Sequence, residues 1–337
     1  MGIRHRWRPP RALLGLLLIC SISSAAVLCW GGWALLRQER AAEEHEQQQQ
    51  AAAQADRVQI QLRDSLAAME LRIGDWISRP PLRMEDTAAE LFLVLEGAGI
   101  EAYPRQRLLY YPPAPQTPEA GAERWAEAER LEYQEGKPAE SAMMYRRMAK
   151  GAAPEVRAAA LLRLGRVSSR IAQTSAALEA YRSLEVMEEV QVAGAPAGLV
   201  AGTAMAQLLF DRGRTDEARE QAASVRRGLQ SGRWRLSQGQ LGFYWSETGR
   251  VLGDGSAAPD CSLSEAVGDV SRVLRDGVED RGVLHRRAGG KNWLVVWRRM
   301  GARTGVVFAD PAFYLKPYES DGRFRLQLRD AEGVVVA

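Results

Sequence analysis

The chain has 337 residues, of which 46% are hydrophobic and 26% charged, and its formal net charge is +3. This composition is ordinary for globular protein, leaves room for two or three small domains, and carries too little charge to indicate a nucleic-acid partner. Two of the three cysteines, Cys20 and Cys29, lie in one apolar run and Cys261 stands alone, which excludes a disulfide framework and a cysteine zinc site.

Residues 12–36 carry no charged side chain and read ALLGLLLICSISSAAVLCWGGWALL, with an arginine on either side. At about 1.5 Å per residue, a helix of this length crosses a hydrocarbon core of about 30 Å, so the run predicts a transmembrane helix in contact with membrane lipid. The run is too long for a cleaved signal peptide, which is the alternative, and no clear cleavage site follows it.

The charges around this run predict its orientation. The tail, residues 1–11, has four arginines and no acid, whereas the residues after the run soon become acidic. By the positive-inside rule we expect a single-pass protein of the cell inner membrane, with a cytoplasmic tail and the bulk of the chain extracytoplasmic.

Residues 37–79 are predicted to form one helical stalk, because good helix formers such as EQQQQAAAQA fill it until two prolines follow. Apolar residues then recur at alternating spacings of four and three, which is typical of a coiled-coil seam and predicts a parallel homodimer. An amphipathic helix that packs on its own domain is the open alternative. The seam consists of Leu62, Leu66, Met69, Ile73 and Trp76.

Residues 80–118 are expected to be a small connecting element. The sequence TAAELFLVLE predicts a helix over residues 87–96, and RLLYY predicts a short strand over residues 107–111. Four prolines between residues 112 and 118 then predict a stiff linker and a domain boundary.

Residues 119–252 are helical in pattern and repeat, since Tyr145 and Tyr181 lie 36 positions apart. Such a period predicts an α-solenoid of stacked helix pairs, with a plain helical bundle as the alternative. The pattern resembles tetratricopeptide repeats, which implies a face that binds a protein or peptide partner. The expected repeat core comprises Trp125, Tyr145, Leu161, Leu164, Gly165, Ala177, Tyr181 and Ala218.

Residues 256–337 predict an α+β domain. We expect a helix over residues 263–274, strands near 293–297, 306–308 and 323–329, a short helix after Asp310, and a last strand at 334–336. The domain resembles a PAS or Cache sensor module. Because the last apolar strand has barely begun when the chain ends, we expect the domain to be truncated.

No catalytic, cofactor-binding or metal-binding constellation is evident. The chain has three histidines, and the Cys261–His285 pair has nothing in the sequence to orient it as a nucleophile and base. Neither a Walker-type phosphate loop nor a GxSxG elbow occurs. The arginines Arg226, Arg227 and Arg233 are expected on solvated faces.

Three segments resemble the N-terminal extracytoplasmic input region of bacterial membrane sensor histidine kinases with tetratricopeptide-like repeats. They are RLLYYP at residues 107–112, YRRMAKGAAPEVRAAALLRLGRV at 145–167 and SGRWRL at 231–236, and the resemblance covers most of residues 50–250. It implies signal input to a two-component system. No kinase residue is carried over, because the second membrane helix, the phospho-accepting histidine motif and the ATP-binding boxes are missing. The competing interpretation is a complete membrane-anchored scaffold that binds an envelope protein.

Overall fold

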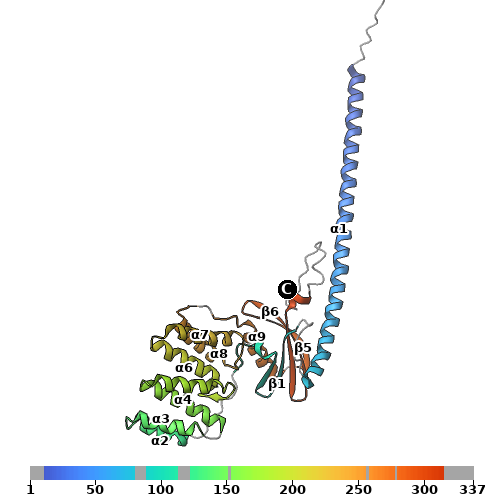
Figure 1. Ribbon diagram of the computed structural model, residues 1–337. Helices are drawn as coiled ribbons and strands as arrows, with labels where there is room; N and C mark the ends of the chain where they lie inside the picture. The colour runs from blue at the N-terminus through green and yellow to red at the C-terminus, as the bar shows by residue number, and fades with distance from the viewer. Residues whose placement is uncertain are drawn as a thin grey trace, which may run out of the picture. The chain divides into compact units, whose positions relative to one another are not determined.

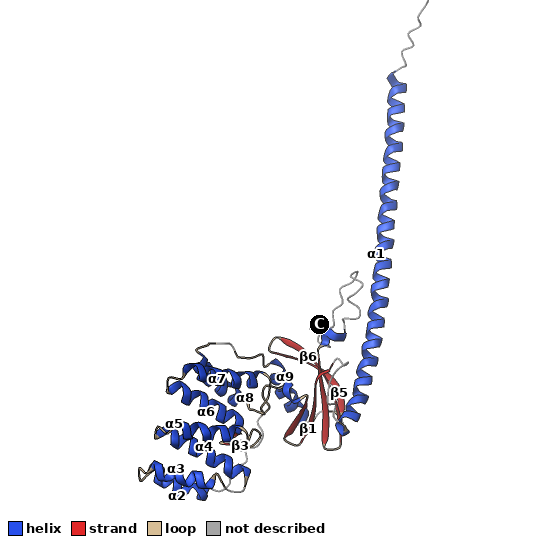
Figure 2. Cartoon of the chain, viewed as in Figure 1, coloured by secondary structure: helices blue, strands red, loops and turns tan. Residues whose placement is uncertain are grey.

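The computed structural model describes residues 11–79, 89–112, 122–150, 153–255, 258–277 and 279–314, and within them the chain is mainly helical with a small antiparallel sheet (Figures 1 and 2). It divides into two units. The described part of the first unit, residues 11–65, is helix, while the sheet and the remaining helices belong to the second unit, which begins at Leu66.

Helix α1 runs from Arg11 to Ser78 and therefore includes both the predicted membrane span and the predicted stalk. It ends just before Pro80, whose ring is incompatible with a continuing helix. Most side chains of residues 12–36 lie outside the described residues. Among the residues that the structure does describe, no helix is long and apolar enough to cross a membrane, so the span stays a prediction.

The second unit contains an array of helices in which each member packs against the next along the chain (Figure 1). Prolines stand at the first positions of α3 and α4, where a missing N–H costs no hydrogen bond. A hairpin of two-residue strands, β3 (Gln191–Val192) and β4 (Ala195–Pro196), precedes α6. The helices are α2 (Ala122–Tyr133), α3 (Pro138–Met148), α4 (Pro154–Arg170), α5 (Thr174–Glu185), α6 (Ala197–Asp211), α7 (Thr215–Gln230) and α8 (Gln238–Leu252).

The expected repeat-core residues are all buried in this array. Tyr145 has no exposed surface, and Trp125 is 3% exposed. Gly165 lies directly against Tyr181, since a Cβ atom there would stand 2.4 Å from the tyrosine ring. The glycine therefore lets α4 and α5 approach closely, and a larger residue would force them apart.

The sheet has five antiparallel strands in the order β2-β1-β7-β6-β5. Its members come from both sides of the helix array, because β1 and β2 precede the array and pair with β7, which follows it. The segment expected to be a connecting element thus supplies two strands. The strands are β1 (Ala89–Glu96), β2 (Gly99–Tyr103), β5 (Arg281–Ala288), β6 (Lys291–Met300) and β7 (Arg303–Ala309).

Two secondary-structure predictions in this part were wrong. Residues 89–96 form strand β1 and not a helix, because the short apolar run is a strand buried on both faces, which periodicity alone does not distinguish from a buried helix. Residues 107–111 form no strand. A 3₁₀ turn, η1 (Arg105–Arg107), is followed by extended chain whose amides find partners outside the sheet.

Helix α9 (Ser262–Arg275) covers one face of the sheet, through contacts with alternate strand residues such as Leu93, Val295 and Phe308. This helix and strands β6 and β7 match the sequence prediction, whereas strand β5 was missed. A 3₁₀ helix, η2 (Pro311–Tyr314), follows Asp310, whose carboxylate accepts a hydrogen bond from the Ala312 amide at 2.9 Å. The predicted strands 323–329 and 334–336 lie outside the described residues.

The other face of the sheet is covered by the last turns of α1. Met69, Ile73 and Ile77 are buried there against Phe92 and Val307, among others. Strand β7 contributes Gly305, where a Cβ atom would lie 2.6 Å from Ile73 Cγ2 and 2.8 Å from Ile77 Cγ1. The absence of a side chain at this position therefore lets α1 lie directly on the backbone of β7.

This packing occupies most of the proposed dimer seam. Leu66 and Trp76 are partly buried against the sheet beside Met69 and Ile73, and Leu62 lies one turn before the contact. The lower part of the seam thus follows the alternative, an amphipathic helix packed on its own domain. A homodimer stays a prediction for Leu62 and the residues before it.

Disulfide crosslinking tests the two roles of the seam. In a chain whose native cysteines are replaced by serine, Ile73→Cys should not crosslink, because the side chain is covered by the sheet of its own chain. Leu62→Cys should crosslink more readily than its exposed neighbour Arg63→Cys if the upper seam joins two copies. Equal crosslinking at Leu62 and Arg63 would argue against the seam, and efficient crosslinking at Ile73 would show that α1 leaves the sheet.

Candidate functional site

A short segment, residues 104–112, connects the sheet to the helix array. On one side, the amides of Leu109 and Tyr110 donate hydrogen bonds to Ser264 Oγ on α9 at 3.1 Å and 3.3 Å. On the other side, the Tyr111 amide donates to the Leu236 carbonyl at 2.8 Å, in the loop between α7 and α8. These bonds satisfy backbone groups that would otherwise be buried without partners, so the segment is fixed to both parts.

The loop 231–236 fits closely against this segment. Gly232 adopts a φ of +62°, and a Cβ atom there would lie 2.6 Å from the Gln106 carbonyl oxygen. The Arg235 guanidinium lies 4.7 Å from the centre of the Tyr111 ring and donates a hydrogen bond to the Ile100 carbonyl. Thus the RLLYYP and SGRWRL segments, which are far apart in the sequence, contact each other at the junction of array and sheet.

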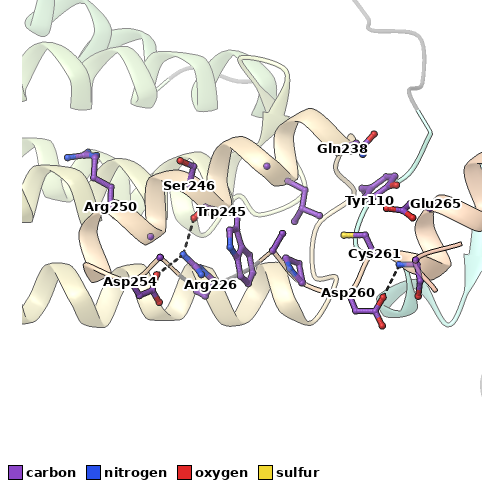
Figure 3. Close-up of a pocket in the computed structure, with 18 residues that line it drawn as sticks. Tyr110, Arg226, Gln238, Trp245, Ser246, Arg250, Asp254, Asp260, Cys261 and Glu265 are labelled. Carbon is purple, nitrogen blue, oxygen red and sulfur yellow. Dashed lines mark hydrogen bonds and ion pairs between the residues drawn. The ribbon is translucent and has the colours of Figure 1, made fainter. Parts of the chain in front are cut away.

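A cavity of about 980 Å³ opens beside this junction (Figure 3). Helix α8, the loop that follows it, the first turn of α9 and Tyr110 form its walls, and Gly289 of the β5–β6 turn also reaches it. Its volume is at the upper end of the range for small-molecule sites. We take it as the candidate functional site because all parts of the junction meet there.

Arg226 lies at one end of the cavity and is 6% exposed. Its Nε donates to Thr248 Oγ1 at 3.0 Å, and its Nη2 donates to the Trp245 carbonyl at 2.9 Å and lies 3.4 Å from Asp254 Oδ1. The guanidinium also stands 3.9 Å from the centre of the Trp245 ring. The positive charge and the N–H donors of Arg226 are thus engaged by α8 and by the loop that follows it. The side chain therefore fixes α7 to both.

Tyr110, Cys261 and Glu265 lie at the opposite end of the cavity (Figure 3). Burial, followed by the negative charge of Glu265, raises the pKa of Tyr110 to about 12. Burial also raises the pKa of the Cys261 thiol, and Glu265 and Asp260 raise it further. Both groups are therefore neutral at pH 7, and the thiol is a poor nucleophile there.

Asp260 is a second carboxylate at this end of the cavity. A hydrogen bond from Lys291 Nζ at 2.6 Å, together with one from the Ser262 amide at 3.0 Å, lowers its pKa to about 2. The ion pair joins the N-terminus of α9 to the start of β6, so the wall of the cavity is tied to the sheet.

The structure does not bring Cys261 and His285 together at this site. Cys261 lines the cavity, whereas His285 does not and has its Nε2 atom 3.1 Å from Asn292 Oδ1 on β6. Among the described residues, no group of His, Cys, Asp and Glu side chains has the arrangement of a metal site.

The cavity residues were not identified from the sequence. None of the expected repeat-core or seam residues lines it. Arg226 was expected on a solvated face, which is wrong. Its partners Thr248 and Trp245 belong to α8, so the periodicity of α7 alone does not reveal that this side chain is buried. Tyr110 belongs to the RLLYYP segment, one of the three segments that resemble sensor histidine kinases. That resemblance was the signal in the sequence that singled out a residue of the cavity.

Comparison with protein-family models, with curated proteins and with solved structures found no match to this chain. Its function is therefore argued from the geometry of the cavity and its surroundings.

Neighbouring arginines test the structural role of Arg226. Replacing it by methionine removes the donors to Thr248 and to the Trp245 carbonyl, and should lower the free energy of unfolding by about 2–4 kcal/mol. Arg227→Met, at the exposed adjacent position, should cost no more than about 0.5 kcal/mol. Chemical denaturation followed by tryptophan fluorescence measures both, and equal losses would contradict the buried role of Arg226.

Proposed function

We propose that this chain is a membrane-anchored extracytoplasmic signal-input module, the sensor part of a two-component histidine kinase whose phosphotransfer is carried out by other residues. One observation supports this above the rest. Helices α9 and α1 cover opposite faces of the same sheet, and the first turn of α9 forms a wall of the cavity.

The strands provide a direct mechanical connection between these two faces. Along β7, Phe308 points toward α9 and Val307 toward α1, as expected when successive side chains alternate across a strand. A displacement of α9 by a ligand in the cavity therefore reaches Ile73 of α1 through one layer of strands. A sensor needs such a coupling between its ligand and its anchor.

The helix array is proposed to be a tetratricopeptide-like solenoid that binds a protein or peptide partner. Contacts between alternate helices recur at similar sequence offsets, as a stacked repeat requires. Arg163 pairs with Glu129 at 3.3 Å between α4 and α2, 34 positions apart, and Gln221 donates to Glu185 at 3.0 Å between α7 and α5, 36 positions apart. The sheet with α9 is proposed to be a PAS- or Cache-like sensor domain.

Two tryptophans support the membrane anchor. Trp30 and Trp33, near the end of the predicted span, are 71% and 55% exposed. The Arg37 guanidinium lies 4.6 Å from the centre of the Trp33 ring. Exposed tryptophan beside arginine is typical of the membrane–water interface, where the ring contacts the apolar side of the boundary and the charged group stays in water.

A membrane-anchored scaffold for an envelope protein is the alternative. It is favoured by the array alone and requires no coupling between the cavity and α1. The two functions therefore differ in a measurable property, the response of α1 to changes at the junction.

Labelling in intact cells tests the topology. With the native cysteines replaced by serine, Arg146→Cys on the exposed face of α3 should react with a membrane-impermeant maleimide. A cysteine at Ile3 in the tail should react only after lysis, because the arginine-rich tail is expected in the cytoplasm. The reverse pattern would contradict the extracytoplasmic location of the helix array and therefore the proposed sensor.

Alanine substitutions at two glycines with left-handed backbone conformations test the coupling between the junction and α1. Gly232→Ala and Gly213→Ala impose similar strain, at φ values of +62° and +72°, but only at Gly232 would the new Cβ meet another segment, the carbonyls of Gln106 and Leu108. Gly232→Ala should therefore speed hydrogen exchange in residues 69–77 of α1 severalfold, whereas Gly213→Ala should speed it only within the array. Unchanged exchange in residues 69–77 for Gly232→Ala would favour the scaffold.

A further inference from the structure

The Tyr110 side chain reaches the cavity with an unused polar group. The residue is 6% exposed, and its hydroxyl makes no hydrogen bond with any residue that the structure describes. The hydroxyl is accessible from the cavity, so it is available to donate or accept a hydrogen bond with a bound molecule.

Glu265 is the second group at this end that lacks a partner. Of the acids that line the cavity, Asp254 pairs with Arg226 and Asp260 pairs with Lys291. Glu265, on the first turn of α9, forms no salt bridge within the described ranges of the chain, and its side chain is exposed toward the opening. The cavity therefore has one carboxylate available to a ligand.

Two carboxylates lie at this end of the cavity, Asp260 and Glu265, and only Asp260 is paired with a base, Lys291. After burial, the negative charge of Glu265 is the largest influence that raises the pKa of both Tyr110 and Cys261. Because the charge of Glu265 has no salt-bridge partner among the described residues, this end of the cavity favours a cation.

The remaining walls combine apolar side chains with two arginines that already have partners. Leu241, Pro259 and Trp245 line the cavity. The guanidinium of Arg226 is bound by Thr248, Asp254 and the Trp245 carbonyl. Arg250 lies 3.5 Å from Glu247 and near the Phe210 ring. A carboxylate or phosphate ligand would have to compete with these contacts, whereas an apolar group could pack on Leu241 and Trp245 without displacing any.

We propose that the cavity binds an organic amine, whose protonated nitrogen lies between the Glu265 carboxylate and the Tyr110 hydroxyl and whose apolar body packs along Leu241 and Trp245. This assignment deepens the proposed function, because it gives the chemical class of the molecule that a junction sensor would detect. It does not depend on the membrane anchor or on the coupling to α1.

Cys261 provides a measurement of occupancy at the same end of the cavity. With Cys20 and Cys29 replaced by serine, it is the one thiol in the full chain. The probe is phenethylamine, and its matched anion is 3-phenylpropionate. Phenethylamine should slow alkylation of Cys261 by N-ethylmaleimide to a saturating limit, whereas 3-phenylpropionate should leave the rate unchanged.

Variants separate the carboxylate from general effects on the fold. Glu265→Gln should raise the half-protecting concentration of phenethylamine about tenfold, which corresponds to about 1.4 kcal/mol. Tyr110→Phe should raise it severalfold without any change of charge. Asp269→Asn removes an acid one turn along α9 that does not line the cavity, so it should raise that concentration much less than Glu265→Gln does.

Three results would overturn the proposal: no protection by phenethylamine at any soluble concentration, equal protection by 3-phenylpropionate, or equal weakening by Asp269→Asn and Glu265→Gln. The test is independent of the function proposed above. If phenethylamine binds but Gly232→Ala does not change hydrogen exchange in α1, the cavity is an amine site that does not signal to α1. If Gly232→Ala changes that exchange but phenethylamine does not bind, the junction is coupled to α1 and its ligand is of another class.

Discussion

The structure depends on the pairing of β1 with β7. These strands lie on opposite sides of the helix array in the sequence, so the array is an insertion within one sheet domain. Seven register pairs join them, from Ala89 with Ala309 to Glu96 with Arg303. Such a long-range pairing requires that both ends of the inserted array come together, and the contacts of residues 104–112 with loop 231–236 and with Ser264 meet that requirement.

The position of the cavity follows from the same constraint. An inserted array leaves and re-enters the sheet domain at neighbouring points. Tyr110 arrives on the outgoing segment, and Cys261 arrives on the returning one. The cavity thus forms between two chain crossings, which is a common location for ligand sites because residues from distant parts of the sequence meet there.

Elements with local signals were predictable from the sequence, and elements that depend on distant partners were not. Helix α9 has a strong amphipathic pattern, and the burial of Tyr145 and Tyr181 follows from their spacing in helices. Strand β1 was mistaken for a helix because residues 91–95, LFLVL, are an unbroken apolar run, and only the position between β2 and β7 makes the segment a strand. The partners of Arg226 and of Tyr110 lie on other helices or outside any regular element, so no pattern within their own segments revealed the cavity.

The contact of Ile73 with Gly305 limits how α1 moves on the sheet. Ile73 and Ile77 both lie over a notch that exists because β7 has no side chain at Gly305. Since packed surfaces deform little, an axial slide of α1 would press these two side chains against the neighbouring residues of β7. The two isoleucines therefore fix the axial position of the last turns of α1 on the strand.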